Sequence, residues 1–393
     1  MTDSLPPLAR RCQRIAPFHV MALLGRAQAL QAAGHDVIHL EVGEPDFPTP
    51  APILAAGQQA LARGLTHYSP AAGIMPLREA IAGHYRDTFG VQVSPEQILI
   101  TPGASGALQL LLALLVNPGD GVLVADPGYP CNRHFVELVN GVPRPLALNP
   151  AEGLRVTARG LDQAWQTDTV AALLASPDNP TGNVFDDSEL AALVAVAAKH
   201  QGALIVDEIY QGLVYDRPAN TVLRHSLDVP VINSFSKYFG MTGWRLGWLV
   251  APQPWIEPLE RMAQNFFLAA STPAQHAALA AFTPDTAAEL ERRRQVLGQR
   301  RRALLAALAD LGLPVMGQPE GAFYIYVDVS SVTNDSFAFC ERLLEEEKVA
   351  LTPGLDFGTG QPAHRYLRFA YTCDAARIEE ALARLKAFLE RHG

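Results

Sequence analysis

Four short, largely apolar runs in the middle of the chain each predict a buried strand. They cover residues 97–101, 170–175, 203–206 and 229–232, and polar residues follow each of them. Unbroken apolar runs of this length are typical of parallel strands that are covered on both faces. From about residue 50 to residue 283, apolar runs alternate with turns and helical stretches. We therefore predict an α/β fold built from βαβ units around a parallel sheet.

Helical patterns lie between and after these runs. Asp186 and Glu189 have the spacing of a capping box and predict a helix that ends near Gly202. The apolar stretch 107–116 predicts a buried helix, because it is much shorter than the ~20 residues that cross a bilayer. The long charged stretch 289–311 predicts a helix that connects two domains.

The C-terminal third of the chain has a different pattern and predicts a second domain. Two strands and a final amphipathic helix are expected over 322–328, 365–371 and 374–391. A chain of 393 residues also exceeds the ~150 residues of one average domain. We predict a large domain over residues 50–288 and a smaller α+β domain formed by residues 1–49 and 289–393.

Charge and cysteine content exclude several classes of function. A net charge of −9 does not suit non-specific nucleic-acid binding, because phosphate backbones select basic surfaces. The four cysteines show neither pairing nor metal-ligand spacing, which indicates a reducing compartment and no metal site. Arg10, Arg11 and Arg14 precede no unbroken apolar segment, so we expect no secretory signal, no membrane association and a cytoplasmic protein.

Lys237 follows the fourth apolar run, with Ser234 three residues before it and Arg245 eight residues after it. A lysine amine held at a strand end can form a Schiff base with an aldehyde, and a serine with an arginine can hold an accompanying phosphate. Taken alone, Lys237 fits a surface loop at least as well. The ends of the other three runs decide between these interpretations.

The polar residues after the other three apolar runs fit the same kind of ligand, a phosphate-bearing aldehyde. Asp207 follows the third run and is either a helix N-cap or a carboxylate that pairs with a protonated pyridine nitrogen. Asn179 lies in the polar turn after the second run. The first run leads through the glycine-containing turn 102–106, which includes Ala104 and Ser105, into the helix predicted over 107–116, and such a helix N-terminus binds anions. Since open α/β sheets bind ligands at the carboxyl ends of their strands, we expect these residues to meet at one edge.

Four motifs together resemble one enzyme family. Ser-x-Ser-Lys (234–237) precedes Gly-x-x-Gly-x-Arg-x-Gly (240–247), and Asn-Pro-Thr-Gly (179–182) and Asp-x-x-Tyr (207–210) lie upstream. Their order resembles the fold-type I pyridoxal-phosphate enzymes, most closely the class I/II aminotransferases of the aspartate aminotransferase superfamily, over about residues 42–387. The resemblance implies a mostly parallel, seven-stranded sheet flanked by helices in the large domain, and pyridoxal 5′-phosphate as the cofactor.

The resemblance also implies a role for each matching residue. Lys237 matches the lysine that forms the Schiff base and moves the substrate proton, Asp207 the partner of the pyridine nitrogen, and Tyr210 a donor to the phenolic oxygen. These three are the expected catalytic residues. Further cofactor contacts are expected. Asn179 matches a second donor to that oxygen, and Tyr129 matches an aromatic residue that stacks on the ring. The phosphate ligands are Ala104, Ser105, Ser234 and Arg245, and Tyr68 matches a tyrosine that reaches the phosphate of the neighbouring subunit.

Substrate contacts follow from the same resemblance. Arg368 matches the arginine that binds the α-carboxylate, a task that suits a planar, bidentate guanidinium, although a strand arginine can also face solvent. Gly43 matches a backbone that approaches the same carboxylate, and Asn179 is a further expected contact. Ser105 stands where some relatives that accept dicarboxylates have lysine, so we expect a neutral or apolar donor. Candidates for the side-chain pocket are Phe18, His19, Met21 and Phe357.

The sequence therefore predicts a cytoplasmic, homodimeric aminotransferase with shared active sites that acts on an L-amino acid and a 2-oxo acid. A pyridoxal-phosphate-dependent C–S β-lyase, or a related reaction at the α- or β-carbon, is the alternative, because a fold does not fix a reaction. A cofactor-binding regulator is a different class, but the chain has no spare basic domain for DNA. The amino donor itself stays open.

Overall fold

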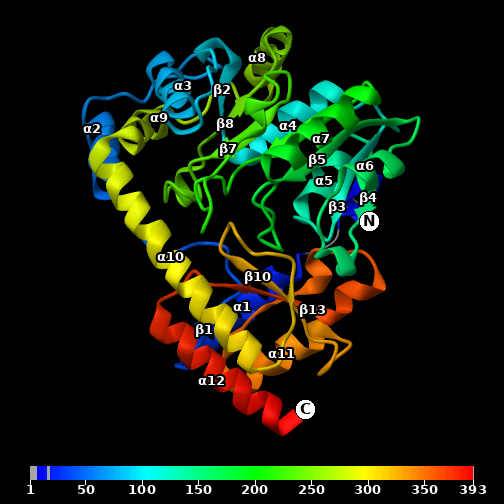
Figure 1. Ribbon diagram of the computed structural model, residues 1–393. Helices are drawn as coiled ribbons and strands as arrows, with labels where there is room; N and C mark the ends of the chain where they lie inside the picture. Colours follow the sequence, from blue (N-terminus) through cyan, green and yellow to red (C-terminus); the bar gives the residue numbers. More distant parts are fainter. Residues whose placement is uncertain (1–6, 16–17, 393) are drawn as a thin grey trace, which may run out of the picture.

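A seven-stranded sheet forms the centre of the upper half of the molecule in Figure 1. The computed structural model describes residues 7–15 and 18–392. The strands of this sheet are, in spatial order, β2 (Ile98–Thr101), β8 (Gly247–Val250), β7 (Val231–Ser234), β6 (Ala203–Asp207), β5 (Thr169–Ala175), β3 (Gly121–Asp126) and β4 (Val142–Ala147). Strand β8 runs antiparallel to both neighbours, and the pairs from β7 to β4 are parallel. The predicted mostly parallel α/β sheet is confirmed.

The four apolar runs form β2, β5, β6 and β7, as predicted. Alternate residues of these strands enter two different buried clusters: Leu173 and Ile205 pack on one face of the sheet, and Leu174 and Val206 on the other. Because both faces are covered, these strands need no polar alternation. Strand β7 starts two residues later than the predicted run at 229, which places Lys237 in the loop just beyond its end.

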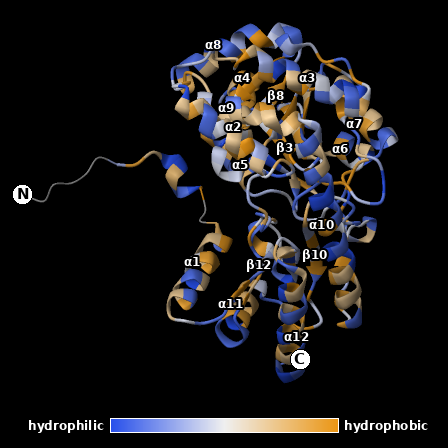
Figure 2. Ribbon diagram, turned by 90° about the vertical axis from the view of Figure 1, so that its left-hand side faces the viewer, coloured by the Kyte–Doolittle hydropathy of each residue, from blue (hydrophilic) through white to orange (hydrophobic). Residues whose placement is uncertain are grey.

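Helices cover both faces of this sheet. They are α2 (Ala51–Ala62), α3 (Met75–Phe89), α4 (Gly103–Leu115), α5 (Cys131–Leu138), α6 (Ala158–Ala164), α7 (Asp187–Lys199), α8 (Ile256–Phe266) and α9 (Thr272–Ala278). The buried helix predicted over 107–116 starts four residues earlier, at Gly103. In Figure 2 the hydrophobic segments gather on the strands and on the inner sides of these helices. None of the helices of residues 7–15 and 18–392 combines the length and the apolar character that a membrane crossing needs.

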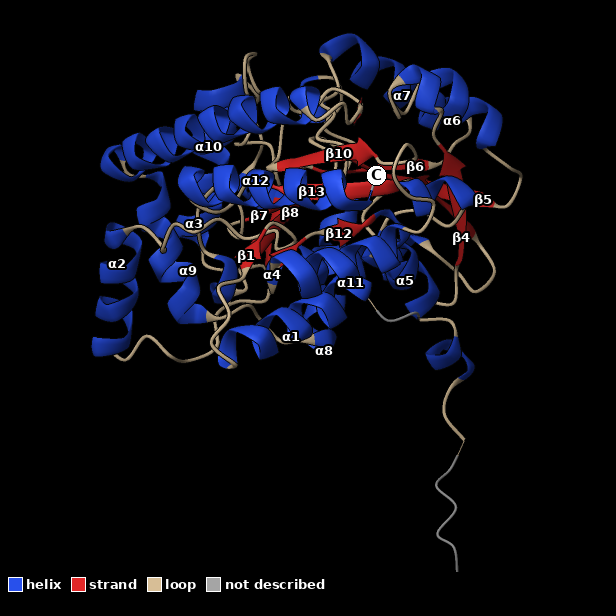
Figure 3. Cartoon of the chain, turned by 90° about the horizontal axis from the view of Figure 1, so that it is seen from below, coloured by secondary structure: helices blue, strands red, loops and turns tan. Residues whose placement is uncertain are grey.

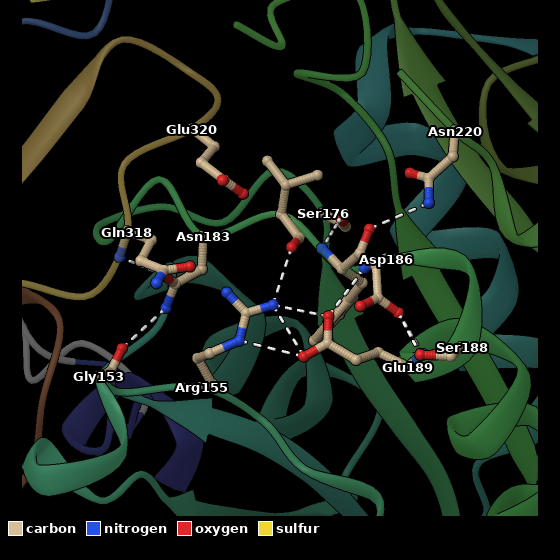
Figure 4. Close-up of polar contacts among 12 residues, drawn as sticks. Gly153, Arg155, Ser176, Asn183, Asp186, Ser188, Glu189, Asn220, Gln318 and Glu320 are labelled. Carbon is tan, nitrogen blue, oxygen red and sulfur yellow. Dashed lines mark hydrogen bonds and ion pairs between the residues drawn. The ribbon is translucent and has the colours of Figure 1, made fainter. Parts of the chain in front are cut away.

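The predicted capping box at α7 is present and belongs to a larger polar cluster (Figure 4). The Arg155 guanidinium donates to both carboxylate oxygens of Glu189, at 2.8 and 2.6 Å from one nitrogen. The Asn183 side chain accepts a hydrogen bond from the Gln318 backbone at 2.7 Å. This cluster fixes the segment that follows Asn179 against the C-terminal part of the chain.

A second, four-stranded sheet lies below the first in Figure 1. It is antiparallel and consists of β12 (Thr352–Pro353), β13 (Tyr366–Ala370), β10 (Tyr324–Asp328) and β9 (Val315–Met316), while β1 (Ile38–His39) pairs with β11 (Val349–Ala350). Figure 3 shows helices around these strands: α1 (His19–Ala32), α10 (Pro284–Asp310), α11 (Ser336–Glu347) and α12 (Ala375–His392).

The long helix α10 runs from the upper to the lower half of the molecule (Figure 1) and begins five residues before the predicted 289. The lower half has its own buried cluster, which includes Leu304, Ile325 and Phe369. The division into domains of 50–288 and of 1–49 with 289–393 stays a prediction, and these separate buried clusters support it.

Candidate active site

A cavity of about 280 Å³ lies at the carboxyl ends of the central strands and brings the predicted residues together. Its lining includes eleven of them: Gly43, Ala104, Ser105, Tyr129, Asn179, Asp207, Tyr210, Ser234, Lys237, Arg245 and Arg368. Tyr68 does not line this cavity. It lies in the loop between α2 and α3, and 83% of its surface is exposed.

Lys237 points into this cavity from the loop after β7. Its Nζ atom donates a hydrogen bond to the Gly43 carbonyl at 2.8 Å and lies 5.9 Å from the ring centre of Tyr210. An amine bound inside a cavity is not a surface-loop lysine, so that interpretation is wrong.

Burial lowers the pKa of the Lys237 amine to about 8. The negative charge of Glu44 opposes this change, and the positive charges of Arg368 and Arg245 add to it. A substantial neutral fraction of the amine is therefore present near neutral pH, and the neutral amine is the nucleophile.

Asp207 is the last residue of β6 and is buried. Its Oδ1 atom accepts a hydrogen bond from the Ile209 backbone at 3.0 Å. No helix follows it, because residues 209–212 form a turn and Val214 a β-bridge, so the helix N-cap interpretation is wrong. Burial raises the pKa of Asp207 to about 6, while the Lys237 charge lowers it. A carboxylate in this setting is stabilised by a cationic partner in the cavity, such as a protonated ring nitrogen.

Two hydrogen-bond donors lie beside these groups. The hydroxyl of Tyr210 is 3.0 Å from the hydroxyl of Tyr324, and burial raises the pKa of Tyr210 far above its ordinary value, so this hydroxyl keeps its proton. The Oδ1 atom of Asn179 accepts from Arg368 at 3.0 Å. Its amide nitrogen is therefore the atom that can donate to a ligand.

The first turn of α4 forms an anion cradle. No side chain of the described residues caps this helix, whose N-terminus therefore offers unpaired backbone N–H groups around Ala104 and Ser105. A Cβ atom on Gly103 would lie 2.7 Å from a guanidinium nitrogen of Arg245, so the glycine lets this cation approach the helix. The Ser234 hydroxyl lies 2.9 Å from the hydroxyl of Ser236, a residue of the Ser-x-Ser-Lys motif that had no predicted role. Helix dipole, guanidinium and hydroxyls together fit a phosphate.

Arg368 projects from β13, and its guanidinium is buried against two aromatic rings. Its Cζ atom lies 4.1 Å from the ring centre of Tyr324 and 4.8 Å from that of Phe357. The solvent-facing interpretation is therefore wrong. Hydrogen bonds at 3.0, 2.7 and 3.2 Å hold the guanidinium in one orientation, through Asn179 Oδ1, the Glu41 carbonyl and Thr352 Oγ1.

Helix α1 closes the cavity with apolar side chains. Phe18 and Met21, both predicted candidates, line it, and Leu24 lies three residues beyond Met21 on the same helix face. Helical spacing was the signal that could have identified Leu24. His19 instead binds Asp356 at 2.8 Å, and Phe357 packs behind Arg368. Other lining residues that had no predicted role include Leu108, Asn132, Ile209 and Tyr324.

Comparison with known proteins gives one consistent result. The family model "Aminotransferase class I and II" matches residues 35–385. The chain is 36% identical to the valine–pyruvate aminotransferase of Mycobacterium tuberculosis, over 95% of this chain and 97% of that protein. It is 35% identical to the aspartate/prephenate aminotransferase of Thermus thermophilus, over 98% of this chain and 99% of that protein. A crystal structure of an aminotransferase from Mycobacterium tuberculosis superposes with a TM-score of 0.95 at 36% identity, covering 98% of this chain and 100% of that one.

The lowered pKa of Lys237 predicts how fast its amine reacts with an added aldehyde, for which pyridoxal phosphate serves as the probe. Because only the neutral amine attacks an aldehyde, the rate should rise with pH through a midpoint near 8, well below the ordinary lysine value of 10.5. Stopped-flow absorbance measures this rate. Lys237→Ala should abolish covalent attachment after borohydride reduction, whereas Lys199→Ala, which removes a surface amine bound to Asp162, should not. A midpoint near 10.5 would contradict the effect of burial.

Proposed function

The chain belongs to the class I and II aminotransferase family, and we propose that it uses pyridoxal 5′-phosphate to transfer the amino group of a neutral or apolar L-amino acid to a 2-oxo acid. It is an aminotransferase. The observation that carries the finer proposal is the meeting of Lys237, Asp207 and Arg368 in one cavity beside an anion cradle.

The residues of the cavity fit this cofactor. Bound pyridoxal phosphate supplies an aldehyde and a ring that accepts electrons. We assign its phosphate to Ser234, Arg245 and the start of α4, its ring nitrogen to Asp207, and its phenolic oxygen to Tyr210 and Asn179. Tyr129, which follows β3, supplies the stacked ring.

The same cavity provides the groups that handle the substrate. The guanidinium of Arg368 is fixed in one plane and suits a bidentate contact with the α-carboxylate, and Gly43 lines the same cavity. Among the described residues that line the cavity, Lys237 carries the only amine. We therefore assign to it the removal of the proton from the substrate α-carbon.

The lining favours an uncharged donor side chain. Its cationic side chains are Lys237, Arg245 and Arg368, and each already has a role in the proposal. The end formed by α1 is apolar, and Ser105 adds no charge. The relatives are named for valine–pyruvate and for aspartate/prephenate, so their names alone do not decide the donor.

We further propose a cytoplasmic homodimer with shared active sites. The exposed Tyr68 lies outside the cavity of its own chain, and other large apolar side chains are also exposed, among them Leu61, Phe266 and Leu268. Burial of such side chains commonly takes place at a subunit interface. The free cysteines Cys12, Cys131, Cys340 and Cys373 support a reducing compartment.

A single-turnover screen tests the reaction and the donor class. With an amino acid alone, the bound cofactor should convert to pyridoxamine phosphate and release the matching 2-oxo acid, with neutral and apolar donors fastest. Absorbance spectra of the enzyme, recorded for each amino acid, measure this. Release of pyruvate and ammonia without that conversion would show a β-lyase, and a clear preference for acidic donors would contradict the proposed donor class.

Substitution of Arg368 tests the carboxylate contact. Loss of a charge-assisted bidentate contact in a buried site costs ~2–5 kcal/mol, so Arg368→Ala should lower kcat/KM by roughly 30- to 5000-fold for every donor. Arg368→Lys should recover only part of this loss, because an ammonium group lacks the planar fork. Steady-state kinetics with several donors measure the effect, and a loss confined to acidic donors would contradict the assignment.

Mixed dimers test the shared site. Tyr68→Phe chains combined with Lys237→Ala chains form a hybrid in which one site carries both changes and the other carries neither. Activity should therefore exceed that of either parent dimer. A mixture that gains nothing, or a fully active monomer in sedimentation, would contradict a shared site.

A further inference from the structure

Tyr324 is the first residue of β10, and neither the sequence motifs nor the roles assigned above include it. We propose that Tyr324 is a positioning residue: its hydroxyl donates to the hydroxyl of Tyr210 and thereby directs the proton of Tyr210 to the phenolic oxygen of bound pyridoxal phosphate. This inference rests on the proposed function. It names a group that acts on the cofactor site through another side chain.

The two hydroxyls face each other at the junction of the two halves of the molecule. They lie 3.0 Å apart, and both side chains are buried. Tyr210 follows β6 of the upper sheet, whereas Tyr324 belongs to the lower sheet. Their rings meet edge to face, with centres 5.7 Å apart. The two hydroxyls are therefore in direct hydrogen-bond contact, and both side chains have little exposed surface.

Three neighbours hold Tyr324 in place. The guanidinium of Arg368 lies 4.1 Å from its ring centre, a distance at which a cation is attracted to the ring face. Backbone pairing of Tyr324 with Ala370 fixes the start of β10 beside β13. A Cβ atom on Gly43 would lie 2.0 Å from the Tyr324 hydroxyl oxygen. The hydroxyl therefore occupies the space that the glycine leaves free.

The protons of this pair have a preferred order. Within residues 18–392, each of the two hydroxyls has the other as its hydrogen-bond partner. Burial raises the pKa of both hydroxyls and the positive charge of Arg368 opposes that rise in both, whereas their mutual hydrogen bond lowers the pKa of Tyr324 and raises that of Tyr210. Tyr324 is thus the better donor. When Tyr210 accepts from it, the proton of Tyr210 is free to point into the cavity, and the chain of two hydrogen bonds strengthens that donation.

The test is a pH titration of the visible absorbance of bound pyridoxal phosphate. Without Tyr324's hydroxyl, negative charge on the phenolic oxygen is less stabilised, so the chromophore should keep its proton to a higher pH. In Tyr324→Phe the midpoint should rise by roughly 0.3 to 1 unit, the size of one hydrogen bond. Tyr210→Phe should raise it further, and Tyr210→Phe with Tyr324→Phe should equal Tyr210→Phe alone. Other charged or titratable groups near the pair stay in place: Tyr129, Asp207, Lys237 and Arg368.

Tyr326→Phe is the matched control. Tyr326 lies two residues further along β10, and its buried hydroxyl has no hydrogen-bond partner among the described residues, so its removal should leave the midpoint unchanged. Two results would overturn the positioning role while leaving the proposed function intact. One is an unchanged midpoint in Tyr324→Phe. The other is a double variant whose midpoint exceeds that of Tyr210→Phe by the whole shift seen in Tyr324→Phe. Failure of the unaltered protein to bind pyridoxal phosphate with a visible band would overturn the proposed function itself.

Discussion

The burial of ionisable groups at one end of the central sheet is the constraint on which the rest of the structure depends. Burial lowers the pKa of Lys237 to about 8 and raises that of Asp207 to about 6, so both groups are less charged than in water. The buried guanidinium of Arg368 is held by hydrogen bonds and lies against two aromatic rings. A fold that needed only stability would not place such groups in an apolar cavity. Their arrangement is explained by a ligand that supplies the missing partners.

The same constraint accounts for the way in which the two halves meet. Hydrogen bonds join Lys237 to Gly43, Asn179 to Arg368, and Tyr210 to Tyr324, and each pair has one member from each half of the molecule. The half with the central sheet therefore supplies the groups assigned to the cofactor, and the other half supplies those assigned to the substrate carboxylate. Helix α10 spans both halves, and a displacement of one half against the other would alter all three contacts together.

Sequence reasoning identified four strands of the central sheet, β2, β5, β6 and β7, from their apolar runs, and it identified the polar residues directly after them, because parallel strands end at one edge. It did not predict β3, β4 or β8. Strand β8 begins at Gly247, the last residue of the glycine- and arginine-containing motif, and it pairs antiparallel in a sheet expected to be mostly parallel. It also missed Tyr324. That residue begins a strand of the other half and meets Tyr210 across 114 positions of the chain, a contact that only the folded structure reveals.

Gly43 was predicted as a site residue, but the sequence indicated only one of the two reasons for a glycine at this position. The sequence interpretation gave one reason for a glycine, the close approach of a substrate carboxylate to the backbone. The structure adds a second, because the position of a Cβ atom there is already taken by the Tyr324 hydroxyl. Gly43 also presents its carbonyl to Lys237 at 2.8 Å. The absence of a side chain at Gly43 thus leaves room for the Tyr324 hydroxyl, which contacts Tyr210, and the Gly43 carbonyl contacts Lys237. Tyr210 and Lys237 are therefore both positioned through a loop that precedes each of them by more than 150 residues.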